Sequence, residues 1–161
     1  MATFHFTGID EYASKISSLV EKSEGMIKRA VYDGAAEVMK AMKAEIAGLP
    51  VIENRYRKTD IPMRGVTETQ KRGLLDGIGF AKMRNDGGLI NTKIGFDGYN
   101  GVRSKKYPNG QPNALIARAV NSGSSVRVKI PFINRAVKAA KAGAEAAMAA
   151  RFDADTQNMI K

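Results

Sequence analysis

A long amphipathic stretch near the start of the chain constrains the fold more than any other feature. Within Ile9–Ala47 apolar residues recur every three or four positions, the spacing of one helical face. At 1.5 Å per residue such a helix would be roughly 57 Å long, more than a small domain covers with its own core. It therefore either kinks near Gly25 or Gly34 or leaves part of its apolar face for another chain. The residues of this face are Ile9, Tyr12, Ile16, Leu19, Val20, Ile27, Ala30, Val31, Ala35, Val38, Met42 and Ile46.

Alternating apolar and polar residues predict short strands around this helix. Phe4–Thr7 is long enough for one strand, and Thr7 can cap the helix that follows. Residues 78–96 read as a β-hairpin with a loop of about four residues, 85–88, rich in Asn, Asp and Gly. A third strand is expected at Val126–Ile130, with Arg127 and Lys129 facing solvent.

Two further helices complete the expected fold. A short one is predicted over 113–121, and Gly123 ends it. Pro131 suits the first turn of the last helix, which runs from about Phe132 to Thr156 or beyond and is rich in alanine. We therefore expect a single α+β domain over 1–161, in which a small antiparallel sheet is braced by a long N-terminal helix and an Ala-rich C-terminal helix. Phe132, at the corner between strand and helix, should be buried against both.

Two segments without a steady period are expected to be flexible loops, at about 50–72 and 97–112. Both mix cations with tyrosines, a combination that can contact an acidic protein surface or stack on nucleic acid. Their candidate partner-interface residues are Arg55, Tyr56, Arg57, Lys58 and Arg64 in the first loop, and Tyr99, Arg103, Lys105, Lys106 and Tyr107 in the second.

The net charge of +10 is distributed unevenly along the chain. Basic minus acidic residues give −1 for 1–47, +6 for 48–110 and +5 for 111–161, which together make +10. The positive charge therefore lies beyond the first helix. A basic surface of this kind indicates a polyanionic neighbour or an acidic protein partner, and it also serves solubility.

Composition and motif searches exclude several classes of chemistry. The chain has no cysteine and a single histidine, His5, so disulfides, thiol catalysis and most zinc sites are excluded. No apolar run is long enough to span a membrane, and the N-terminal residues lack a signal-peptide pattern. The carboxylates are scattered, and Asp153, Asp155 and Asn158 lack the spacing of a calcium loop. We expect no catalytic, cofactor-binding or metal-binding residues, and no enzymatic activity.

The order of these elements and four short motifs resemble the neck proteins of long-tailed bacteriophages, which are also called head–tail joining, tail-completion or minor tail component proteins. Two motifs open the first helix and the sheet: Gly8-Ile9-Asp10 and Thr67…Gly73-Leu74-Leu75. The more telling two are Ala117-Arg118-Ala119-Val120-Asn121-Ser122-Gly123-Ser124 and Pro131-Phe132-Ile133-Asn134-Arg135-Ala136. The chain departs from the family pattern at Asn121, where an acidic residue is common, and at Ser124, where threonine is common.

The resemblance implies a non-enzymatic virion protein, made in the host cytoplasm and assembled at the head–tail junction. Its partners would be copies of itself in an oligomeric ring, the head connector or stopper, and the tail terminator or tail tube. Contact with DNA in the channel would be incidental, and no membrane would be involved. Two alternatives stay open: a tail terminator, and a small basic nucleic-acid-binding module that uses the two loops.

Overall fold

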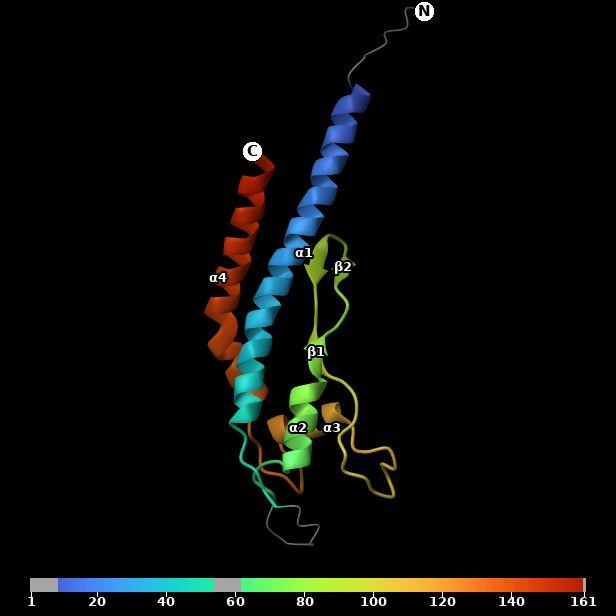
Figure 1. Ribbon diagram of the computed structural model, residues 1–161, viewed down its shortest axis with the longest axis vertical. Coiled ribbons are helices and arrows are strands. Elements are labelled where there is room, and N and C mark those ends of the chain that lie inside the picture. The colour runs from blue at the N-terminus through green and yellow to red at the C-terminus, as the bar shows by residue number, and fades with distance from the viewer. Residues whose placement is uncertain (1–8, 54–61, 161) are drawn as a thin grey trace, which may run out of the picture.

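Two long helices, α1 (Ile9–Ala47) and α4 (Phe132–Ile160), lie side by side and form the spine of the structure (Figure 1). The structure is a computed structural model that describes the backbone of residues 9–53 and 62–160, with side chains from 22 to 53 and from 62 to 159. Two short helices, α2 (Glu68–Gly77) and α3 (Asn113–Ser122), pack at one end of the spine, and a β-hairpin runs from there along α1 (Figure 1). The predicted α+β class, with a small antiparallel sheet beside a long first and an Ala-rich last helix, is confirmed. The strand and cap expected around Thr7 lie outside the described residues.

Close packing of α4 explains Gly34, one of the two positions at which the sequence allows a kink in α1. The α1 helix is uninterrupted from Ile9 to Ala47. A Cβ placed on Gly34 would come within 2.5 Å of Met148 Cγ and 3.2 Å of the Ala144 carbonyl oxygen. Glycine therefore lets α4 approach the α1 backbone, as small residues do at close helix contacts.

The predicted hairpin is present, with a tighter turn than expected. Strand β1 (Ile78–Phe80) pairs antiparallel with β4 (Ile94–Phe96), and β2 (Arg84–Asp86) pairs with β3 (Leu89–Asn91). The loop contains only Gly87 and Gly88, both at positive φ. A two-residue turn with two positive φ angles is favoured in hairpins because its twist matches that of the flanking strands. Residues 85 and 86, predicted as loop, therefore belong to β2.

The hairpin lies along α1 (Figure 1). The ring of Phe80 in β1 lies 5.2 Å from that of Tyr32 in α1, and Ile90 in β3 is buried. The sheet is thus held against the spine by aromatic and aliphatic contacts.

The hydrophobic core lies between four elements: the C-terminal half of α1, the start of α4, α2 and α3. Phe132 is fully buried there, and its ring makes an edge contact with that of Phe96 in β4 at 6.2 Å. This confirms the expectation for Phe132. The buried core residues are Met42, Ile46, Leu49, Val66, Leu74, Ile78, Ile116, Ala117, Val120, Phe132 and Ala136.

The prediction of a regular third strand at Val126–Ile130 is wrong, and so is the outward orientation predicted for Arg127, whereas Lys129 is exposed as predicted. This segment makes only isolated bridges, with Met63 and within its own turn. Arg127 points inward and is 5% exposed, whereas Val126 is 61% exposed. Arg127 is drawn inward because its guanidinium satisfies buried oxygen atoms, which an apolar side chain could not do.

The segment predicted as a loop over 50–72 is also shorter than expected, because α2 begins at Glu68. The Thr67 hydroxyl accepts a hydrogen bond from the Gln70 backbone N–H, and the Gln70 side chain accepts one from the Thr67 N–H, both at 3.2 Å. This reciprocal capping box starts a helix in a sequence that has little apolar period.

Candidate partner interface

Most of the described candidate residues lie on one loop at the end of the molecule opposite the first turns of α1 (Figure 1). We call residues 97–112 the basic–aromatic loop. Its side chains of Tyr99, Arg103, Lys105 and Lys106 are exposed, and Tyr107 is partly so. Against the three cations of the loop, Asp97 is its single carboxylate, so the loop keeps a net positive charge. The loop therefore presents cations and aromatic rings together.

Two buried asparagines attach this loop to the fold. Asn113, the first residue of α3, donates from Nδ2 to the Asp97 carbonyl oxygen at 2.8 Å and from its backbone N–H to the Gly98 carbonyl oxygen at 3.0 Å. Asn100 donates its backbone N–H to the Gln111 carbonyl oxygen, and its Oδ1 accepts from the Val102 N–H, both at 2.9 Å. The two ends of the loop are thus joined by hydrogen bonds of two asparagines whose side chains are buried.

Close backbone approaches beneath the loop require glycine. A Cβ on Gly110, which has φ of 104°, would overlap the Asn100 carbonyl oxygen. On α2, a Cβ at Gly73 would come within 2.6 Å of Asn113 Oδ1, and one at Gly77 within 2.4 Å of the Asp97 carbonyl oxygen. The loop therefore rests directly on one face of α2, which explains these glycines in structural terms.

The outer part of the loop is a tight turn from Ser104 to Tyr107. The backbone groups of these two residues exchange hydrogen bonds in both directions at 3.1 Å, and the Ser104 hydroxyl accepts a third from the Tyr107 N–H. The Lys106 ammonium lies 5.6 Å from the centre of the Tyr107 ring, within cation–π distance. The turn holds a cation and an aromatic ring as one unit that a partner can contact.

Arg64 lies on a separate segment that a chain of polar side chains connects to the loop. The Arg127 guanidinium donates to the carbonyl oxygen of Gly65, the residue after Arg64, and to Gln70 Oε1 at 3.2 Å. Gln70 Nε2 in turn donates to Gln111 Oε1, in the basic–aromatic loop, at 2.8 Å. The structure therefore joins the Arg64 segment to the second loop through Arg127 and Gln70. The candidates Arg55, Tyr56, Arg57 and Lys58 lie outside the described residues.

Arg127 is a buried cation that meets only neutral partners. Within residues 22–53 and 62–159 no carboxylate pairs with it. Burial disfavours the charged form and lowers the pKa of the Arg127 guanidinium. Sequence reasoning placed this residue at the surface, since alternation with valines is the usual signal of an exposed cation. The sequence analysis also missed the start of the neighbouring helix α2, which the Thr67-x-x-Gln70 capping pattern could have indicated.

Comparisons with protein families, with curated proteins and with solved structures found no match to this chain. Among the described residues no group of three or more His, Asp or Glu side chains is placed to hold a metal ion. None of the helices in the described part of the chain is long and apolar enough to cross a membrane.

Proposed function

We propose that this protein is a structural component of a phage virion at the head–tail junction, where it forms part of a ring between the head connector and the tail. The observation that carries the proposal is that the two longest motifs behind the resemblance form one structural unit. The Ile130 N–H donates to the Val120 carbonyl oxygen at 2.7 Å, and Asn121 binds the first turn of α4. Phe132, at the centre of the second motif, fills the core beside them.

The basic–aromatic loop gives this proposal a contact surface. A protein that joins two assemblies needs exposed anchors and charges that orient its partners. Tyr99, which is 65% exposed, and Tyr107 supply aromatic surface, and the cations around them favour an acidic partner. In this role the tyrosines hold the contact, and the charges set its orientation and rate of formation.

The test reverses the six densest cations of the two loops: Arg55, Arg57, Lys58, Arg103, Lys105 and Lys106. The three that the structure describes are exposed, so the isolated protein should remain folded by circular dichroism. Heads and tails made separately with the reversed protein should fail to join. A matched control reverses Lys138 and Lys141, exposed cations on α4 far from the loop in the chain, and should join normally. Normal joining by the six-fold variant would overturn the proposed role of the loops.

One observation favours a second function, binding of nucleic acid. Lys106 beside Tyr107, together with the exposed Tyr99, is an arrangement on which bases can stack. Under the junction proposal, a filter-binding titration against random duplex DNA should give only nonspecific affinity, roughly 10⁻⁴ to 10⁻⁶ M at physiological salt. Nanomolar binding, together with normal head–tail joining by the reversed protein, would establish the nucleic-acid function instead.

A further inference from the structure

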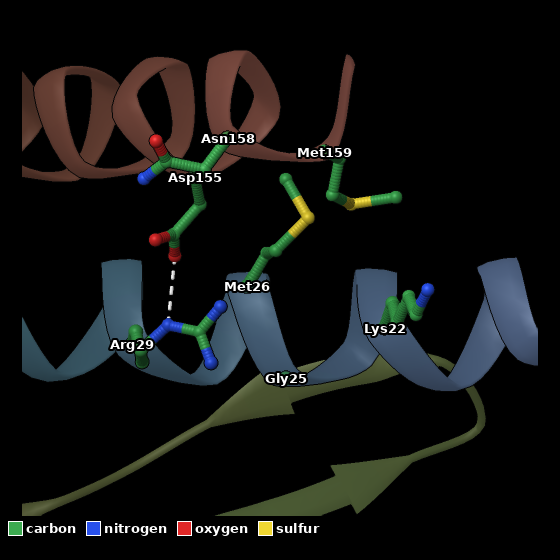
Figure 2. Close-up of a pocket in the computed structure, with 7 residues that line it drawn as sticks. All are labelled: Lys22, Gly25, Met26, Arg29, Asp155, Asn158 and Met159. Atoms are coloured by element: carbon green, nitrogen blue, oxygen red, sulfur yellow. Dashed lines mark hydrogen bonds and ion pairs between the residues drawn. The ribbon is translucent and has the colours of Figure 1, made fainter. Parts of the chain in front are cut away.

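A groove of about 440 Å³ opens between α1 and the last turns of α4 (Figure 2). Met26 of α1, which is 4% exposed, lies toward α4, and Met159 of α4, which is 39% exposed, lies beside it. Methionine side chains adapt their shape to a contact and are frequent where proteins bind helices. The groove lies at the end of the molecule away from the basic–aromatic loop, and Met159 is the exposed apolar side chain in its otherwise largely polar lining.

Cations border this groove on the α1 side. The Arg29 side chain is held by Asp155, with Nε to Oδ2 at 2.8 Å (Figure 2). Lys22 is exposed and forms no ion pair within the described residues. No described carboxylate therefore competes with an acidic group that enters the groove and approaches Lys22.

The chain itself contains a segment with the matching chemistry. The first turns of α1 extend past the last turn of α4, and no other described element accompanies them (Figure 1). The sequence of this segment, residues 9–21, carries apolar residues at helical spacing. It has three carboxylates, Asp10, Glu11 and Glu21, against one amine, Lys15, so its net charge is −2 in a chain of +10.

We propose that the groove lined by Met26 and Met159 binds residues 9–21 of a second copy of this chain. The apolar residues of that segment would contact the exposed Met159, which lies beside the buried Met26, and its carboxylates would approach Lys22. Such a contact joins two different surfaces, so it repeats from copy to copy and builds a ring if the rotation closes. The inference specifies a contact for the self-association within the proposed function and rests on that function for its biological setting.

Charge reversal tests the contact by sedimentation equilibrium of the full chain. The wild type should self-associate, and Lys22→Glu should weaken the association at least about tenfold. Lys138→Glu, an equal charge change at an exposed site on α4 outside the groove, should leave it unchanged. Both variants should unfold at the wild-type denaturant midpoint, because both side chains are exposed.

A rescue experiment identifies the occupant. A chain with Asp10→Lys and Glu11→Lys should associate as poorly as Lys22→Glu. An equal mixture of the two proteins should recover association, since each reversed groove then meets a reversed segment. A wild type that stays monomeric, a Lys22→Glu chain that associates normally, or a mixture without recovery would overturn the inference. Self-association that persists in Lys22→Glu, with head–tail joining intact, would leave the proposed function standing and remove only this contact.

Discussion

The Asn121 side chain at the end of α3 caps the first turn of α4. Its Oδ1 atom accepts the backbone N–H of Ile133 at 3.0 Å, and its Nδ2 atom donates to Asn134 Oδ1 at 3.3 Å. The first N–H groups of a helix have no partner within the helix, so this contact satisfies one of them. A carboxylate at position 121 would also be favourable, because negative charge stabilises a helix N-terminus.

Substitutions at Asn121 should therefore separate hydrogen bonding from charge. Asn121→Ala should lower the free energy of unfolding by about 0.5–2 kcal/mol, as the loss of a helix cap does. Asn121→Asp keeps the acceptor and adds negative charge near the α4 N-terminus, so it should retain or exceed wild-type stability at neutral pH. Urea denaturation of the three proteins measures this order. If Asn121→Ala were as stable as wild type, the hydrogen bond would contribute nothing.

Phe132→Ala should be severely destabilising. The ring is fully buried against the core, and truncation of a buried phenylalanine costs about 3–5 kcal/mol. Phe152, on the same helix but 41% exposed, is the matched control, and Phe152→Ala should cost clearly less. Denaturant midpoints of both variants give the comparison, and equal losses would contradict the packing described for Phe132.

Among the described residues the buried charge of Arg127 has no carboxylate partner, and this predicts opposite results for two substitutions. Arg127→Met removes the donor to the Gly65 carbonyl oxygen and to Gln70 Oε1, and should destabilise by about 1–3 kcal/mol. Gln70→Glu gives the guanidinium a carboxylate while keeping an oxygen acceptor for the Thr67 N–H. It removes the Nε2 donor to Gln111 Oε1, so the Gln111 side-chain amide must turn to donate in its place. With that rearrangement the variant should hold or raise stability at pH 7.

The Gln70→Glu effect should depend on pH. The ion pair with the guanidinium should hold the pKa of the new carboxyl in the folded state below its value in the unfolded chain, against the raising effect of burial at this position. Its contribution is therefore complete at neutral pH and is lost as pH falls through the lowered pKa. Thermal melts of wild type and variant between pH 7 and pH 3 should converge or cross on the acid side. A constant difference across that range would show that no ion pair forms.

The two glycines inside α1 should respond differently to alanine. A Cβ on Gly25 would meet only Arg29 Nη1, at 3.6 Å, so Gly25→Ala should stabilise by about 0.5–1 kcal/mol through helix propensity. Gly34→Ala would displace the Met148 side chain of α4. It should lower stability by about 1–3 kcal/mol, the usual cost of an overpacked contact. Thermal unfolding of the two variants checks the signs, and a gain at both sites would contradict the close approach of α4 at Gly34.

Long, regular segments were predictable from sequence, whereas short irregular ones were not. The bounds Ile9–Ala47 follow from a sustained apolar period and a glycine stop, and Phe132 follows from a proline-led helix start. Arg127 could not be placed, because its inward orientation depends on the Gly65 carbonyl oxygen, far away in the chain. The cations of the second loop were predictable as exposed, but the asparagines that hold the loop act through tertiary contacts that no local pattern encodes.

The pairing of α1 with α4 also has a consequence for the order of synthesis. Residues 48–131 must be translated before the first residue of α4 exists, so the α1 face that α4 covers stays without this partner on the ribosome. The ion pairs Arg29–Asp155 and Glu45–Arg135 likewise cannot form until their α4 residues have been translated. Contacts so distant in sequence slow folding, and an uncovered apolar helix is prone to aggregation in the meantime. Newly made chains should therefore depend on chaperones until α4 is complete.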